Sequence, residues 1–206
     1  MKYRTAEDIE SLLLDEQETI VNKIDPEKID VYLFLHDLFK KTDVTTNRVF
    51  QFAFRHFYKL DNPSLTQEFQ DRYFEIMEQQ RNDKHSSIVN VVTELYEIKN
   101  HKGNPTMQFP LATAMLHTLN PNFPTYDSDV AKAFDFSSTY HLNGFYKKMK
   151  RYVDQYQHTF DTYKILMERE SLAPMFDHFE TRFPRNGLSK VKKMDLMVAE
   201  LGKQLS

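Results

Sequence analysis

The stretch Asp25-Pro-Glu-Lys-Ile-Asp-Val-Tyr-Leu-Phe-Leu-His-Asp-Leu-Phe-Lys-Lys41 contains in one segment the signals that recur along the whole chain. Asp25 is a preferred helix N-cap, and Pro26 suits the first helical turn, where its missing N–H costs nothing. Apolar residues then return at helical spacing. The residues on this broad face are Ile29, Leu33, Phe34, Leu38 and Phe39. The segment therefore predicts an amphipathic, mostly buried helix over 27–41.

The same combination of caps, apolar periodicity and Pro or Gly breakers divides the rest of the chain into helices. Thr5 begins a capping-box pattern, Thr45 or Thr46 and Ser86 or Ser87 open two further helices, and Gly144 marks a start or a kink. The remaining expected helices cover 6–24, 47–60, 65–81, 88–99, 107–119, 127 or 128 to 134, 138–170, 172–183 and 188–205. With only four glycines and eight prolines, we expect an all-α fold of about nine to ten helices.

Composition sets further limits on the class of protein. We expect a single all-helical domain over 1–206, with a possible hairpin element at 88–119 and a candidate active-site loop at 120–130. No segment reaches the roughly 20 uncharged apolar residues of a membrane helix, and the N-terminus turns acidic where an export signal needs an apolar run. We therefore expect a cytoplasmic protein without membrane contact. The chain has no cysteine, which excludes disulfides and thiolate metal sites.

The segment Phe123-Pro-Thr-Tyr-Asp-Ser-Asp-Val130 is the strongest candidate for a functional site. It follows a helix, a Gly-containing turn at 100–106 and a second helix, and it opens a further helix. Asp127 stands after a proline-bearing loop and before Val-Ala-Lys-Ala, a position that by itself predicts a helix N-cap. A structural cap and a chemical role are compatible for one carboxylate.

The order of these elements resembles the helix-hairpin-helix superfamily of DNA glycosylases, including its 8-oxoguanine glycosylase and endonuclease-like members. In that family a hairpin and its second helix precede a proline-bearing loop and an aspartate that opens the next helix. Tyr126-Asp-Ser-Asp-Val130 is similar to the family's aspartate motif, and Leu111–Leu116 stands where the second hairpin helix is expected. The hairpin departs from the family pattern because it has Gly103 where the family carries two glycines.

The resemblance implies a monofunctional DNA N-glycosylase that removes a damaged or modified base, with duplex DNA and a flipped base as partner and no cofactor or metal. Asp127 would be the catalytic carboxylate and Tyr126 would line the base pocket. His101, Lys102 and Gly103 would meet the DNA backbone. Bifunctional members carry a lysine that forms a Schiff base at the start of the second hairpin helix. Here that position reads Gln108-Phe-Pro-Leu111 and contains no lysine. The resemblance therefore implies that water removes the base, unless Lys102 reaches in from the turn.

Basic residues elsewhere in the chain are further candidates for contacts with phosphates. They form three groups: Lys99, His101 and Lys102; Lys147, Lys148, Lys150 and Arg151; and Lys190, Lys192 and Lys193. A run of charges is also the ordinary solvated face of a helix. A second, weaker similarity links residues 192–196 to the C-terminal helix of some glycosylase-like proteins.

The alternative function is a non-catalytic helical module that binds nucleic acid or protein. The single glycine of the hairpin and the net charge of −3 favour this alternative. The eight histidines form no metal-binding pattern, and His36 and His117 are expected to be core residues with satisfied hydrogen bonds. Phosphate-binding loops, serine nucleophile elbows and dinucleotide fingerprints are absent from the sequence.

Overall fold

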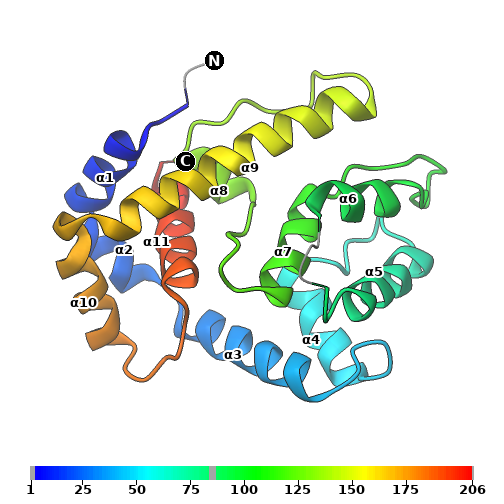
Figure 1. The fold of residues 1–206 in the computed structure, drawn as a ribbon, viewed down its shortest axis with the longest axis horizontal. Coiled ribbons are helices and arrows are strands. Elements are labelled where there is room, and N and C mark those ends of the chain that lie inside the picture. Colours follow the sequence, from blue (N-terminus) through cyan, green and yellow to red (C-terminus); the bar gives the residue numbers. More distant parts are fainter. Residues whose placement is uncertain (1–2, 84–86, 206) are drawn as a thin grey trace. The chain divides into compact units, whose positions relative to one another are not determined.

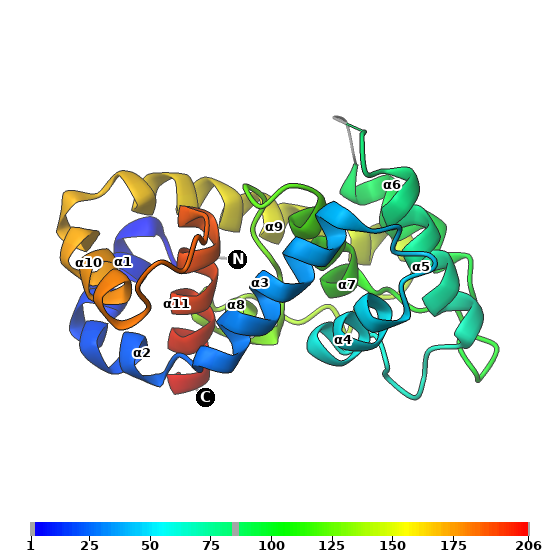
Figure 2. The same ribbon diagram turned by 90° about the horizontal axis from the view of Figure 1, so that it is seen from below.

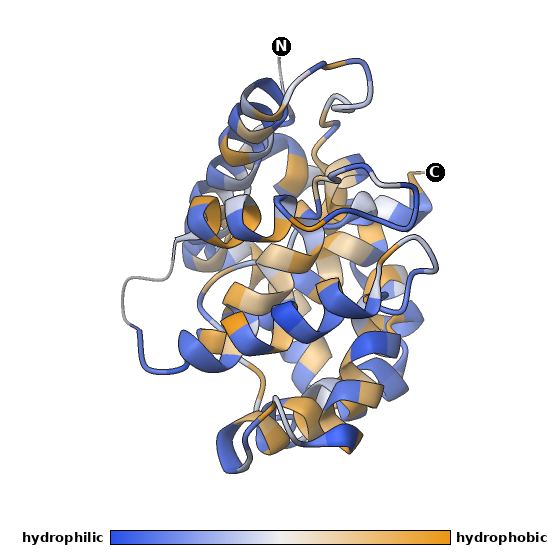
Figure 3. Ribbon diagram, turned by 90° about the vertical axis from the view of Figure 1, so that its right-hand side faces the viewer, coloured by the Kyte–Doolittle hydropathy of each residue, from blue (hydrophilic) through white to orange (hydrophobic). Residues whose placement is uncertain are grey.

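A computed structural model describes residues 3–83 and 87–205, and within these ranges the regular secondary structure is helical (Figure 1). These residues form eleven α-helices, one short 3-10 helix and an isolated β-bridge between Lys99 and Pro105. The predicted all-α fold is therefore confirmed. Hydrophilic and hydrophobic residues interleave along the helices, as expected for amphipathic elements that each bury one face (Figure 3).

The chain divides into two compact units. Unit 1 combines residues 1–29 with residues 121–206, and unit 2 is the continuous stretch 30–120. Helix α3 (Pro26–Lys41) begins in unit 1 and continues into unit 2. The expectation of a single domain stays a prediction, because two units within one chain are compatible with one folding domain or with two.

Unit 1 is built from the first two helices and the last four α-helices. These are α1 (Ala6–Asp15), α2 (Gln17–Lys23), α8 (Ser128–Ala133), α9 (Phe145–Glu168), α10 (Ala173–Arg182) and α11 (Lys190–Gln204), with the 3-10 helix η1 (Glu170–Leu172) before α10. Helix α11 packs on α8, α2, α9 and α1, and α10 packs on α2. Figure 2 shows α8 beside α11 within this unit. Met194, Val198 and Leu201 of α11 are fully or almost fully buried, so α11 forms the centre of the unit.

Unit 2 contains α4 (Arg48–Tyr58), α5 (Gln67–Gln79), α6 (Ile88–Tyr96) and α7 (Phe109–Leu119) together with most of α3. Phe50 and Phe54 of α4 are fully buried and lie in the core of this unit. The Phe54 ring centroid is 5.4 Å from that of Phe50 and 5.6 Å from that of Tyr73 on α5. The buried His117 Nε2 lies 3.1 Å from the Tyr32 hydroxyl, which confirms the predicted role of this histidine in the core.

Most predicted helix starts are close to those observed. Thr5 forms the capping box with Asp8, and Asn47, Thr66 and Ser189 provide side-chain caps for α4, α5 and α11. Ser87 is the N-cap residue of α6, without a side-chain hydrogen bond. The alternative cap, Ser86, lies outside the described residues.

Three predictions on helix extent and burial were wrong. The predicted helix 6–24 is broken at Glu16 into α1 and α2. The predicted helix 138–170 begins only at Phe145. The residue before it, Gly144, adopts a φ of 87°, which glycine tolerates and which does not occur within a right-handed α-helix. Phe34 is 46% exposed, and α3 instead buries the face formed by Ile29, Tyr32, Leu35 and Phe39. Within the described residues, no helix combines the length and the apolarity needed to cross a membrane.

Candidate functional site

The segment that precedes α8 presents Asp127 at the helix start. Asp127 is the N-cap of α8, and its Oδ1 accepts hydrogen bonds from the backbone N–H groups of Asp129 at 2.9 Å and Val130 at 2.8 Å. The prediction of a cap at this position is therefore confirmed. Both capping bonds use the same oxygen, and within the described part of the chain no group donates a hydrogen bond to Oδ2. The residue as a whole is exposed.

Side chains of α9 and α11 form hydrogen bonds with Pro124 and Thr125, which directly precede Tyr126 and Asp127. The hydroxyl of Tyr156 on α9 donates to the carbonyl oxygen of Pro124 at 2.9 Å. The carboxylate of Asp195 on α11 accepts from the Thr125 N–H at 3.0 Å and from the Thr125 hydroxyl at 3.0 Å. Backbone and side chain of Thr125 are thus both fixed by one carboxylate. The segment is an ordered support for Asp127 rather than a free loop.

Asp195 and Lys192 form a buried pair of ionisable side chains behind this segment. Asp195 is 2% exposed and Lys192 is 5% exposed. Burial raises the pKa of Asp195 to about 7, against the opposing effects of Lys192 and of the Thr125 hydrogen bonds. Burial lowers the pKa of Lys192, while the negative charges of Asp195 and Asp127 oppose that shift. The two residues are one helical turn apart, so α11 presents both on one side.

Two lysines and one buried carboxyl group interact electrostatically with Asp127. The negative charge of Asp127 raises the pKa of the Lys28 and Lys192 amines, against the lowering effect of burial. Lys203 lies close enough to Lys28 to lower the pKa of that amine further. The same Asp127 charge adds to the effect of burial in raising the pKa of Asp195.

A close contact between helices sets the position of α8. A Cβ atom added at Gly202 of α11 would lie 1.9 Å from the carbonyl oxygen of Asp129, so only glycine fits there. At the other end of α8, the Arg4 guanidinium donates to the carbonyl oxygens of Lys132 at 2.9 Å and Ala133 at 2.7 Å. The Lys132 carbonyl oxygen also accepts a hydrogen bond from the Asp135 N–H at 3.1 Å, and Arg4 adds a charged donor at this end of the helix, where carbonyl groups run out of partners within the helix. Both ends of this six-residue helix are therefore anchored.

Tyr126, the predicted lining of the base pocket, is 6% exposed. Its hydroxyl donates to Gln155 Oε1 at 2.7 Å, and its ring is stacked with Phe136 at a centroid distance of 6.1 Å. The ring belongs to the core of unit 1 in this structure. A role in stacking a base stays a prediction, and it requires the ring to become accessible.

The predicted DNA-contacting residues His101, Lys102 and Gly103 form an exposed turn between α6 and α7 in unit 2. Asn100 organises this turn: its side-chain oxygen accepts from the N–H groups of Lys102 and Asn104, and its carbonyl accepts from Gly103 N–H at 2.8 Å. The His101 N–H donates to the Ser64 carbonyl oxygen. The amides of this turn are therefore used internally, whereas the His101 and Lys102 side chains are exposed.

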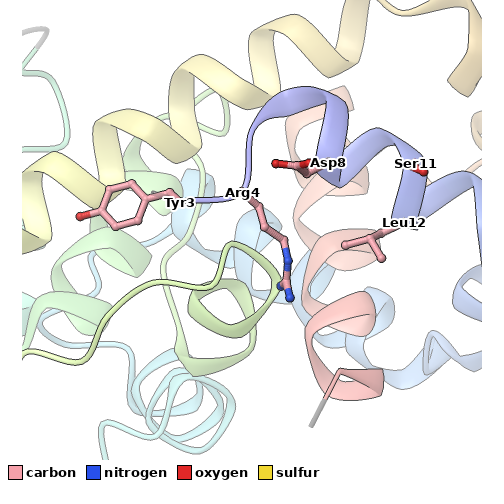
Figure 4. Close-up of a pocket in the computed structure, with 5 residues that line it drawn as sticks. All are labelled: Tyr3, Arg4, Asp8, Ser11 and Leu12. Atoms are coloured by element: carbon pink, nitrogen blue, oxygen red, sulfur yellow. The ribbon is translucent and has the colours of Figure 1, made fainter. Parts of the chain in front are cut away.

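A pocket of about 460 Å³ lies at the N-terminal end of unit 1, lined by Tyr3, Arg4, Asp8, Ser11 and Leu12. Figure 4 shows the Arg4 side chain extending away from α1, in keeping with its hydrogen bonds to the end of α8. The Asp8 carboxylate accepts from the Thr5 N–H in the capping box. The charged groups of this pocket therefore serve the local fold.

The sequence did not identify Thr125, Tyr156 and Asp195 as supports of the site. One signal was present: Asp195 lies four residues after Val191 and three before Val198, on the apolar face of α11. A carboxylate on such a face must find hydrogen-bond partners when the face is buried. The proposed phosphate contact through Lys192 was wrong, because this side chain is buried under the segment that carries Asp127.

The geometry is that of an exposed carboxylate on a rigid support within a helical unit. No protein-family model matches this chain, and no curated protein or solved structure matches it either.

Proposed function

We propose that this chain is a DNA glycosylase-like enzyme that excises a damaged or modified base by hydrolysis of the N-glycosidic bond, with Asp127 as its catalytic carboxylate. The proposal rests on the different hydrogen bonding of the two oxygen atoms of this carboxylate. Oδ1 caps α8 through two hydrogen bonds, whereas Oδ2 accepts none from the described residues, and the residue as a whole is exposed. One aspartate thereby serves as a structural cap and as a reactive group.

Cleavage of an N-glycosidic bond develops positive charge on the sugar. A fixed carboxylate stabilises that charge or orients the attacking water. A carboxylate that is already fixed before the substrate binds loses little conformational entropy during the reaction. The hydrogen bonds from Tyr156 to Pro124 and from Thr125 to Asp195 supply this order.

Water, rather than an amine, is the proposed nucleophile. Helix α7 begins at Phe109 with Gln108 as its N-cap residue, so this helix start contains no lysine. Lys192 lies within the field of Asp127 but is buried, which denies its amine access to a sugar. The expected product is a duplex with an abasic site and intact strands.

The second candidate function is a helical module that binds nucleic acid or protein without catalysis. It is favoured by the turn at 100–104, whose amides donate to Asn100 and Ser64 instead of being free for a phosphate. It is also favoured by the burial of Tyr126, whose ring is packed in the core of unit 1.

The test incubates the protein with duplexes that carry a panel of base lesions and modified cytosines, and then cleaves abasic sites with alkali. We expect at least one substrate to yield alkali-labile product. Asp127→Asn should reduce the rate by about 100-fold or more, since positioned acid–base groups contribute on the order of 100- to 10,000-fold. Borohydride added during the reaction should trap no covalent complex, because no lysine attacks the sugar.

Asp127→Asn is a suitable variant because asparagine is as good an N-cap as aspartate, so α8 should remain intact. Asp129→Asn is the matched control: it removes a carboxylate two residues away whose partner is Lys132 at 3.4 Å. Absence of product on every duplex contradicts the enzyme and leaves the binding module. Equal product from wild type and Asp127→Asn contradicts the catalytic role of Asp127.

A further inference from the structure

Two tyrosines between α8 and the first turn of α9 are almost completely exposed. Tyr140 is 93% exposed and Tyr146 is 85% exposed. Exposing an aromatic ring of this size forgoes roughly 2 kcal/mol of burial free energy. Neither ring contributes to the core of unit 1. Their exposure therefore points to a surface that meets a partner.

The loop that carries Tyr140 has a defined structure. The Thr139 hydroxyl donates to the Tyr152 hydroxyl at 3.0 Å, and the Leu142 N–H donates to the Thr139 carbonyl at 3.0 Å. The Tyr140 N–H donates to the Ser138 hydroxyl at 3.1 Å. Tyr140 is thus held outward by an anchored backbone, which lowers the entropy cost of using its ring in binding.

The stretch of chain that carries the two rings is basic. The sequence contains no Asp or Glu between Asp135 and Asp154, whereas Lys147, Lys148, Lys150 and Arg151 lie in this interval. The exposed face of the first turns of α9 presents Tyr146, Lys147 and Lys150, which recur at helical spacing. This local charge contrasts with the net charge of −3 for the whole chain.

These lysines are poorly placed for helix stability. Helix α9 has no acidic residue in its first turn, and its N-cap, Gly144, makes no side-chain capping bond. Cations near a helix N-terminus are unfavourable because the macrodipole is positive there, and the effect is strongest in the first turn, where Lys147 lies. Lys150 pairs with Asp154, but side-chain exposures of 79% and 52% make that pair weak. A polyanion bound at this face would offset the repulsion.

We propose that Tyr140, Tyr146, Lys147 and Lys150 form a binding surface for single-stranded DNA, here called the Tyr140–Lys150 surface. Aromatic side chains offer stacking faces to unpaired bases, and neighbouring lysines neutralise phosphates. In paired DNA the bases are stacked inside the helix and offer no such face. Figure 1 shows the connection from α8 and the yellow-green start of α9 that carry this surface within unit 1.

This binding role rests on the proposed function, because both take DNA as the partner. It adds that the bound DNA is single-stranded. It does not require base excision. An enzyme that extrudes a nucleotide exposes unpaired bases, and a surface that holds such bases favours the opened duplex.

The test measures the fluorescence anisotropy of a labelled 20-nucleotide oligothymidine against the full-length protein at several salt concentrations. Tyr140→Ala/Tyr146→Ala should weaken binding about tenfold or more, since a stacked base contributes on the order of 1–3 kcal/mol. Tyr140→Phe/Tyr146→Phe should restore it, because the ring is kept. Lys147→Ala/Lys150→Ala should reduce the slope of log Kd against log salt by about 1.4, for two phosphate contacts on a single strand.

Phe52→Ala is the matched control, because Phe52 is 73% exposed on α4 in unit 2 and should leave binding unchanged. Circular dichroism should show that all variants fold, since only exposed side chains change. The proposal is overturned if wild type does not bind the oligonucleotide at low salt, or if the tyrosine variant binds within twofold of wild type. It is also overturned by preference for a duplex, for oligouridine RNA or for vesicles of anionic phospholipid.

The two proposals fail separately. Binding that depends on the Tyr140–Lys150 surface without any abasic product contradicts the glycosylase and leaves the surface. Abasic product together with wild-type binding by the surface variants contradicts the surface and leaves the glycosylase.

Discussion

Two aspartates that act on the same segment have opposite environments. Asp127 is exposed, whereas Asp195 is buried beside Lys192 and bound to Thr125. An exposed carboxylate keeps its contact with water. A buried carboxylate instead pays for desolvation, and its pKa rises. The fold thus keeps the supporting carboxylate, Asp195, away from solvent and leaves Asp127 in contact with it.

The raised pKa of Asp195 predicts a pH-dependent stability. In the unfolded chain its pKa is near 3.8, and in the folded chain it is about 7, so the folded state binds more protons across this interval. Stability therefore falls as the pH rises through this window and levels off above it. Relative to Asp195→Asn, the free energy of unfolding of wild type should fall by about 2 kcal/mol between roughly pH 5 and pH 7.

Urea denaturation of both proteins at the two pH values measures this difference, and titrations common to the two proteins cancel. Charged groups that act on Asp195 are Lys192 and Asp127, and Thr125 donates its hydrogen bonds. A stability difference that stays constant with pH would show that Asp195 is ionised with an ordinary pKa.

At the scale of elements, α8 is a short helix that depends on its neighbours. A helix of six residues is far below the length of roughly 12–15 residues at which isolated helices become marginally stable. Helix α11 packs closely on it through Gly202, and Arg4 binds its last carbonyls. The position of Asp127 therefore follows from packing in unit 1.

Gly202→Ala tests the close contact between α11 and α8. Alanine improves intrinsic helix propensity by about 1 kcal/mol, but its Cβ would meet the backbone carbonyl of Asp129 at 1.9 Å. The helices must separate, and we expect a net loss of about 2 kcal/mol or more in the free energy of unfolding. Chemical denaturation measures it, with Lys203→Ala as the control on the adjoining residue. A stability equal to or above that of wild type would show that the helices separate without cost.

At the scale of the whole molecule, the two units differ in how the chain builds them. Unit 2 is one continuous stretch, whereas unit 1 needs residues from both ends of the chain. Helices α1 and α2 supply Ile9, Leu13, Ile20 and Val21 to the core of unit 1, and all four are fully buried. Removing the N-terminal helices therefore removes part of that core.

This difference predicts the behaviour of two fragments. A fragment of residues 25–120 keeps unit 2 and the Asp25 cap of α3, so we expect helical circular dichroism and a cooperative urea transition. A fragment of residues 121–206 lacks α1 and α2 and should melt without a cooperative transition. A cooperative transition in the second fragment, or its absence in the first, would contradict this division of the chain.

Local signals in the sequence were sufficient for the all-α class and for most helix starts. The Thr5 capping box, the Asp127 cap and the start at Gly144 depend on residues within one or two turns of each other. Such short-range hydrogen bonds and backbone preferences act before any tertiary contact forms. For this reason the role of Asp127 as a helix cap could be predicted from the sequence.

Only the tertiary structure decided how that residue is supported. Thr125 and Asp195 are 70 residues apart, and nothing local to either predicts their hydrogen bonds. Lys192 belongs to a basic run in the sequence but is buried, whereas Tyr140 and Tyr146, for which the sequence made no prediction, are exposed. Burial depends on which helices pack together. It therefore determines the pKa of a carboxylate and the availability of a ring in a way that sequence spacing does not.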